Sequence, residues 1–454
     1  MGKLELNNLG IAPLAGICSY EDAGRVGYAV DHSVNLLKRY IYIVSRCNEI
    51  FASYVAPTPE WEVKCALSLH TWLDAEHSAA LRKRVAEMRE PPLHLDKVPE
   101  PHLQACLDEV IRANNTLELL VGVYRVVKPA LAQAWKHYLH EANPIADHPT
   151  YRLLKLLLGE QQEMIAWGEQ AIVALTQTEE DHATAAAWEN HLQAFLQAAG
   201  GVAGDLAQPE GITLPSPRSD GQPYTVNVVP QRDQRFADPF NRQFYFRDTS
   251  TNEDDAAYVL LCSRLREMDV PEWIGPIIAK TKGKPWEYYV DLSRQLWDEA
   301  RHAMMGEVGL YHEGMPFYAY PVELHASMAL NTEFEPRDAH IILWGIEQAL
   351  MPRKTGKARE VELARATGNA LLVTFQDYDW ADEVLHAQIG RRWLVAEAGG
   401  MEQLRAAFSP LNQQWFESMT KLDARSPQTP WWPTFLVDIR QRRAQREVAD
   451  ATAH

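Results

Sequence analysis

The sequence lacks a hydrophobic run long enough to cross a membrane. No uninterrupted apolar stretch approaches the roughly 18–20 residues that a spanning helix needs. The first residues, MGKLELNNLG, also lack the apolar core of a secretion signal. We therefore expect a cytoplasmic protein that has no membrane partner.

Basic residues and cysteines are both scarce. The chain has 44 Lys and Arg against 61 Asp and Glu, a formal net charge of −17. Such a surface repels phosphate backbones, and no basic stretch interleaved with aromatics offsets it, so nucleic acid is excluded as an expected partner. The five cysteines form no C-x-x-C pair, and we expect them to be reduced rather than bound in disulfides or a zinc site.

Several common catalytic motifs are missing as well. The chain has no G-x-G-x-x-G after a strand pattern, no G-x-x-x-x-G-K-[ST], no G-x-S-x-G and no H-E-x-x-H. These absences remove the motif evidence for dinucleotide binding, P-loop phosphate binding, an α/β-hydrolase nucleophile and a zinc protease.

Apolar residues recur at three- and four-residue steps along most of the chain, which predicts helices. Pro, Gly and capping residues divide the first part of this pattern into helices over residues 20–56, 58–90, 101–141, 150–175 and 178–200. A second series covers 252–280 with a kink at Pro271, 286–311, and two helices between 336 and 399, after a crossover at 314–335.

We predict an all-α fold made of two consecutive four-helix bundles. The expected divisions are a first bundle at residues 1–203, a linker with extended segments at 204–250, a second bundle at 251–400, and a C-terminal helix and tail at 401–454. The linker is rich in Pro, Gly and Ser, and its runs YTVNVVP and RQFYF are strand-like.

Two copies of a D-E-x-x-H motif lie in the second series. They begin at Asp298 and Asp382. Residues three apart share one face of a helix, so the Glu and His of each motif can reach one metal ion. A single E-x-x-H is unremarkable, but two copies in amphipathic helices, each preceded by Asp, are much more specific.

Each motif needs a partner glutamate on the neighbouring antiparallel helix. Glu267 and Glu299 are equidistant from a turn near Gly283, so a hairpin would bring them together. The first motif therefore has a well-placed partner.

The partner of the second motif is less secure. Glu347 and Glu383 are equidistant from Arg365, which precedes a plausible turn at Thr367-Gly368-Asn369. A competing turn at 352–356 would spoil that symmetry.

The resulting set resembles the ligand set of the ferritin-like di-iron carboxylate superfamily, and its members are Glu267, Glu299, His302, Glu347, Glu383 and His386. The DEARH sequence at 298–302 resembles the D-E-x-R-H form of bacterial multicomponent monooxygenase hydroxylases, fatty-acid desaturases and their relatives. The resemblance covers roughly residues 251–400. Residues 20–200 resemble a degenerate copy of the same helical repeat.

The resemblance implies roles for these residues. Glu299 and one further glutamate would bridge two metals, and each histidine would bind one of them. Asp298 and Asp382 would accept the imidazole N–H groups, and Arg301 would pair with a buried carboxylate. His340 and Asp379 are further candidate ligands, although we favour a core or surface histidine and a capping or solvated aspartate.

The charge of this set also supports a site for two metal ions. Four carboxylates in one core repel one another, and two divalent cations cancel their negative charge. Mixed carboxylate and imidazole ligands favour iron or manganese over zinc or calcium. We expect two iron ions as the cofactor, with manganese or a mixed Mn/Fe pair left open.

The expected function is that of a di-iron oxygenase or oxidase, which activates O2 to oxidise a small organic substrate. Hydroxylation, N-oxygenation, desaturation and oxidative cleavage are not separated by the sequence. An electron-donor protein is implied by the resemblance alone, and a homo-oligomer is left open. The alternatives are a manganese or mixed-metal peroxidase or catalase-like enzyme, and a non-catalytic metal-handling or scaffold protein.

The first helical series looks like a relic of the metal-binding plan. Asp74 and His77 repeat the D-x-x-H spacing. Glu160 occupies the place of the second motif. Reflection of Asp74 through the turn near Pro57 lands on Tyr40, however, and reflection of Glu160 or Glu163 through the turn near Ile145 lands on Ala130 or Lys128. We expect a structural domain without metal, in which a cation could replace a ligand.

In the second series, Ala303 and Gly306 suggest room for a substrate.

Overall fold

The structure is a computed structural model, and it describes residues 9–206, 214–219, 221–242 and 253–453. Within these ranges the fold is all-α and contains no strand, as the sequence predicts. One isolated parallel bridge joins Ala237 and Pro321. The strand-like run YTVNVVP forms no strand, and RQFYF lies almost entirely outside the described residues. No helix in the described part of the chain has the length and apolarity to cross a lipid bilayer.

The chain divides into two compact units. The first contains Met1–Asn48 with Leu73–Tyr224, and the second contains Glu49–Trp72 with Thr225–His454. This division differs from a simple cut near residue 203, because the end of one long helix and the start of the next group with the second unit.

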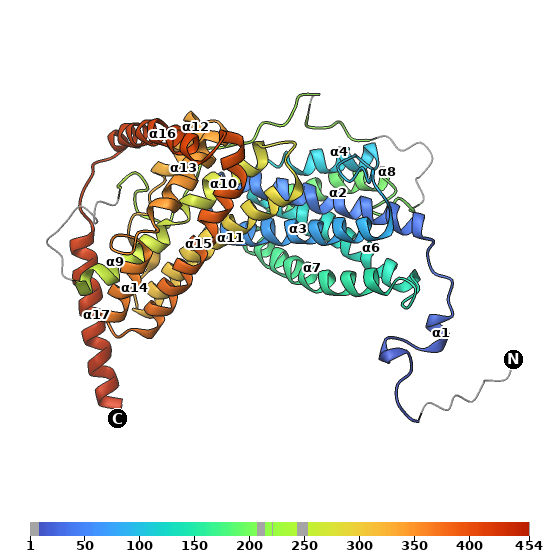
Figure 1. Ribbon diagram of the computed structural model, residues 1–454, viewed down its shortest axis with the longest axis horizontal. Helices are drawn as coiled ribbons and strands as arrows, with labels where there is room; N and C mark the ends of the chain where they lie inside the picture. The colour runs from blue at the N-terminus through green and yellow to red at the C-terminus, as the bar shows by residue number, and fades with distance from the viewer. Residues whose placement is uncertain (1–8, 207–213, 220, 243–252, 454) are drawn as a thin grey trace. The chain divides into compact units, whose positions relative to one another are not determined.

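The helices of the first part of the chain are labelled in Figure 1, except α5, and they are α1 (Tyr20–Ala23), α2 (Val30–Val55), α3 (Trp61–Met88), α4 (Pro101–Val110), α5 (Thr116–Val121), α6 (Lys128–Glu141), α7 (His148–Leu175) and α8 (Glu179–Ala198). The predicted capping box at the start of α8 is present, with Thr178 and Asp181 each capping the other's backbone N–H.

Two predicted helices of this part are interrupted. The helix expected over 20–56 breaks between α1 and α2, where Gly27 has φ +71° and a Cβ would lie 2.5 Å from the Asn143 nitrogen. The helix expected over 101–141 breaks after α4, where the Asn115 side chain accepts from the Glu118 N–H at 2.9 Å and starts α5. α5 then continues through a π-helical segment, Gly122–Val127, into α6. A close tertiary contact at Gly27 and a cap at Asn115 therefore interrupt the continuous apolar pattern.

The helices of the second part are α9 (Glu253–Arg266), α10 (Asp269–Lys280), α11 (Trp286–His312), α12 (His325–Glu333), α13 (Pro336–Ala349), α14 (Lys357–Ala366), α15 (Ala370–Ala398), α16 (Met401–Leu422) and α17 (Trp432–Ala453). α11 packs on α9, α10 and α15, and α15 also packs on α13 and α14. The C-terminal tail expected after one helix is itself helical, as α17.

The break between α9 and α10 falls at Glu267, before the kink expected at Pro271. Proline has no N–H to donate, and its ring clashes with the carbonyl four residues earlier, which here belongs to Glu267. The chain makes tight turns instead, with the Glu267 N–H bonded to the Arg264 carbonyl at 2.9 Å. Glu267 therefore lies at a helix break.

The hairpin expected between the helices of Glu347 and Glu383 is not a simple hairpin. α13 ends at Ala349, the short helix α14 intervenes, and α15 begins after Asn369, whose side chain caps the Leu371 and Leu372 N–H groups. Both proposed turns are therefore used, and the symmetry argument for Glu347 has no hairpin behind it.

The core of the second unit includes the contact between α9 and α11. A Cβ on Gly306 would lie 2.4 Å from the Leu265 nitrogen and 2.6 Å from the Leu261 carbonyl oxygen. The glycine therefore allows two helix backbones to approach closely. The expectation that Gly306 leaves room for a substrate is wrong.

Candidate metal centre

Carboxylates and two histidines from four segments meet inside the second unit. α11 supplies Glu299 and His302, α15 supplies Glu383 and His386, α13 supplies Glu347, and the turn after α9 supplies Glu267. Apart from Glu267, these residues are at most 2% exposed. Ligand atoms lie within 4.8 Å of one another in three overlapping groups, which are Glu299, Glu347, Glu383 and His386; Glu267, Glu299 and His302; and His302, Asp379 and Glu383. All six predicted ligands belong to these groups.

The first group shares Glu299 with the second and Glu383 with the third, and the groups together define two neighbouring positions. We call the neighbourhood of Glu267 and His302 position A, and that of Glu347 and His386 position B. Glu299 lies between them, with Oε2 3.6 Å from His302 Nδ1 and Oε1 3.2 Å from His386 Nδ1. Each oxygen of this carboxylate therefore faces the histidine of a different position.

The far nitrogen of each imidazole faces the aspartate of the opposite motif. His302 Nε2 is 3.1 Å from Asp382 Oδ2, and His386 Nε2 is 3.4 Å from Asp298 Oδ2. An Nε2–H donated to an aspartate leaves the Nδ1 lone pair facing the glutamates. Arg301 Nη2 donates to both aspartates at 2.6 Å, so one guanidinium joins the two motifs.

The donor atoms of the cluster are incompletely satisfied. Among the described residues, Glu267 Oε2, His302 Nδ1, Glu347 Oε2 and Asp379 Oδ2 have no hydrogen-bond partner. A buried polar atom without a partner destabilises a fold by about 1–3 kcal/mol, so clusters of them need an explanation. Convergent carboxylate oxygens and imidazole nitrogens fit iron or manganese, and the residues present therefore suit the metal that the sequence predicts.

Several ionisable groups of this cluster have pKa values far from their usual range. Burial, together with Glu383 and Glu299, raises the pKa of Glu347 well above its usual range. Burial also raises the pKa of Asp379 to about 6, although Arg264 opposes the shift. The carboxylates around the histidines raise their pKa values well above 6.5, against the effect of burial. Metal binding would therefore displace protons.

Two buried cations in the site were not predicted. Lys357 Nζ is 2.8 Å from Glu383 Oε1, 2.9 Å from Asp379 Oδ1 and 3.3 Å from Glu267 Oε1. Arg264 Nη1 is 2.9 Å from Glu267 Oε1 and also contacts Asp379. Arg264 could have been found, because it lies three residues before Glu267. Lys357 could not have been found, because the apolar periodicity predicts no separate helix where α14 lies.

The positive charges of these two cations are matched by two carboxylates outside the set of six predicted ligands. Arg264 Nη2 also lies 3.2 Å from Glu360 Oε2. Arg264 and Lys357 thus offset the two additional carboxylates, Asp379 and Glu360. The net negative charge that remains equals that of four glutamates, which two divalent cations would cancel, although Glu267 and Glu383 themselves contact these cations.

The structure separates the two further candidates. Asp379 is fully buried with Oδ1 3.3 Å from His302 Nδ1, so the favoured capping or solvated role is wrong. His340 is a core residue, with Nδ1 3.4 Å from the Tyr288 hydroxyl, and burial lowers its pKa to about 3. His340 belongs to none of the ligand groups found among the described residues.

The first unit holds an ammonium where its relic motif lies. Lys128 Nζ is 2.9 and 3.0 Å from the two oxygens of Asp74, and both side chains are fully buried. His77 Nε2 is 2.6 Å from Glu160 Oε2. No metal-ligand group occurs in the described residues of this unit.

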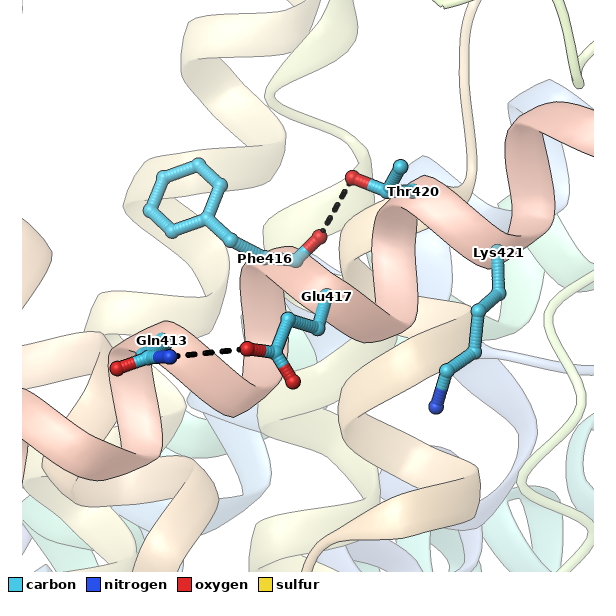
Figure 2. A pocket seen from close by; sticks show the side chains of 5 residues that line it. All are labelled: Gln413, Phe416, Glu417, Thr420 and Lys421. Atoms are coloured by element: carbon cyan, nitrogen blue, oxygen red, sulfur yellow. Dashed lines mark hydrogen bonds between the residues drawn. The ribbon is translucent and has the colours of Figure 1, made fainter.

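A surface hollow of about 480 Å³ lies along α16, a helix that supplies none of the residues of these clusters. Figure 2 shows its lining side chains, where Gln413 donates to Glu417 and the Thr420 hydroxyl donates to the Phe416 carbonyl. All its lining residues come from one helix, so we assign it no role.

Comparison with known proteins adds no relative. No family model matches the chain, and neither a curated protein nor a solved structure matches it. The chemistry of this protein is therefore argued from the geometry of its own buried cluster.

Proposed function

We propose that the second unit is a ferritin-like bundle with a dinuclear metal centre, and that the protein is an O2-activating di-iron oxidoreductase for a small organic substrate. The observation that carries the proposal is Glu299, whose two oxygens face the Nδ1 atoms of two different histidines. A single ion would use one such face, whereas a pair of ions uses both.

Two overlapping sets of residues would hold the two ions. Glu267, Glu299 and His302 would hold one ion, and Glu299, Glu347, Glu383 and His386 the other. When bound, iron supplies the redox chemistry by which O2 oxidises a substrate.

The protein supplies geometry and a dry site. Asp298 and Asp382 fix the imidazole tautomers by accepting from Nε2. Arg301 holds both aspartates in place, and it helps keep the pKa of Asp298 low although burial acts against this. Positioned ligands that need no rearrangement favour tight and specific metal binding.

For the first unit we propose a bundle of the same ancestry that has lost its metal. Lys128 supplies a fixed positive charge beside Asp74, which makes a cation from solution unnecessary there. This unit would then serve as a structural domain.

The test of the proposed activity is single-turnover O2 uptake. Protein loaded anaerobically with Fe(II) should consume O2 in proportion to chain concentration, and Glu383→Ala should abolish the uptake. Glu362→Ala is the matched control, because Glu362 is an exposed glutamate on α14. Iron-loaded protein that consumes no O2 would contradict the proposal. Iron mineralised far beyond two ions per chain would indicate storage, and H2O2 disproportionation by manganese-loaded protein would indicate a catalase-like enzyme.

A further inference from the structure

Both buried cations of the centre contact carboxylates of position A, and Lys357 also contacts Glu383 of position B. Glu267 Oε1 lies near both Arg264 Nη1, at 2.9 Å, and Lys357 Nζ, at 3.3 Å. Asp379 also contacts both cations. The carboxylates around His302, at position A, are therefore already partly neutralised by the protein.

The carboxylates of position B are less involved with these two cations. Glu347 Oε1 accepts from the neutral amide of Gln295 at 3.0 Å, and its Oε2 has no partner among the described residues. Glu383 faces Lys357 with Oε1, but its Oε2 lies 3.2 Å from His386 Nδ1. Glu383 therefore contacts only one of the two cations and Glu347 bonds to a neutral amide, whereas Glu267 and Asp379 each contact both cations.

The consequence is electrostatic. A carboxylate that already neutralises an ammonium attracts a divalent ion less strongly, and the ammonium itself repels that ion. Both effects are large in a buried site, where water screens little. Lys357 is 1% exposed, so this repulsion is not dissipated by solvent.

The first unit shows that this chain uses a buried ammonium in the same manner. Lys128 contacts both oxygens of Asp74, in the relic motif, and no ligand group occurs in the described residues of that unit. Within the described residues, a buried ammonium therefore contacts a motif carboxylate at Asp74, where the ligand set is lost, and at Glu383, where it is complete.

We infer that Lys357 makes the two metal positions unequal. Position B fills first, and position A binds its ion more weakly by about tenfold or more. Until that second ion arrives, the ammonium of Lys357 holds the carboxylates of Glu267, Asp379 and Glu383 together. This inference rests on the proposed dinuclear centre.

The test is an anaerobic titration with Mn(II), in which free and bound ion are counted by electron paramagnetic resonance. Wild-type protein should bind two ions per chain in two resolved steps. Glu347→Gln should lose the tight step, and Glu267→Gln should lose the weak step. These two variants locate each step without altering Lys357.

Lys357→Met should strengthen the weak step by about tenfold or more, bringing the two affinities together. Lys357→Arg keeps the charge and should retain two resolved steps. The matched control is Lys354→Met, since Lys354 is an exposed lysine three residues earlier. If Lys357→Met does not fold, the wild-type titration and the two glutamine variants still decide the order of filling.

Two equal steps in the wild-type protein would overturn the inference while leaving the dinuclear centre standing. A Lys357→Met protein that binds two ions with the wild-type ratio of affinities would overturn it equally. Failure of the wild-type protein to bind Mn(II) or Fe(II) at all would instead overturn the proposed function on which the inference rests.

Discussion

His302 presents Nε2 to Asp382 at 3.1 Å, although the two residues come from different D-E-x-x-H motifs on different helices. The reciprocal pair, His386 and Asp298, repeats the arrangement at 3.4 Å. In the proposed centre, each motif therefore supplies the histidine of one position and the hydrogen-bond partner for the histidine of the other. This exchange ties α11 to α15 at the level of the proposed metal ligands.

Removing one of these partners should weaken metal binding more than folding. In Asp382→Asn the side chain can donate as well as accept, so the tautomer of His302 is no longer fixed. We expect metal affinity to fall by about 10–100-fold, as is typical for the hydrogen-bond partners of ligating histidines. Equilibrium dialysis measures the affinity, with Asp377→Asn on the exposed face of α15 as the control. Equal affinities in the two variants would show that Asp382 does not orient His302.

The stability of the metal-free protein should decrease as pH rises from 5 to 8. The pKa of Asp379 is raised to about 6, and those of His302 and His386 are raised well above 6.5. Raised values mean that the folded state binds more protons than the unfolded state, and this contribution is lost as pH rises through them. Thermal unfolding of metal-free protein measures the effect.

Metal binding should show the opposite dependence, because ions compete with those protons and bind more tightly at higher pH. The pH dependence of unfolding should flatten when both positions are filled. A metal-free protein whose stability rises between pH 5 and 8 would argue that these groups are not protonated together in the fold.

The ammonium of the first unit should be structural. Lys128→Met leaves Asp74 buried without its cation, and breaking a buried pair in this way costs about 3–5 kcal/mol of unfolding free energy. The double variant Lys128→Met, Asp74→Asn should recover much of that loss. Urea unfolding measures both, and metal content should stay at the wild-type value. A loss of bound metal in either variant would contradict a purely structural role.

Close packing of α9 on α11 should depend on Gly306. A methyl group there would meet the α9 backbone, so Gly306→Ala should destabilise the fold by about 1–3 kcal/mol. It should also weaken metal binding, since Glu267 follows α9 directly. The control is Gly159→Ala in α7, where a Cβ would have no neighbour within 4 Å and where alanine favours the helix. If Gly306→Ala unfolds like the wild type, α9 and α11 do not pack as closely as described.

Much of the fold follows from local signals in the sequence. The capping box of α8 and the ends of α7 and α11 lie within a few residues of their predicted positions. The breaks after α1 and α4 were missed because they depend on tertiary contact at Gly27 and on a cap at Asn115, which apolar periodicity does not report.

The candidate site could be predicted in part. Glu299, His302, Glu383 and His386 follow from helical spacing, and Glu267 follows from reflection through a true turn. Glu347 reaches the cluster although the hairpin used to predict it does not exist. Lys357 and the burial of Asp379 depend on helix α14, which spacing alone cannot reveal.

The central claim is that Glu299 serves two metal positions at once. Its most direct test is the iron content of protein loaded anaerobically with excess Fe(II), in the wild type and in Glu299→Ala, with Glu362→Ala as the control. The account predicts about two ions per chain in the wild type and in the control, and a loss of both positions in Glu299→Ala, because each depends on one oxygen of this carboxylate. Wild-type iron content in Glu299→Ala, or no iron in any of the three proteins, would contradict it.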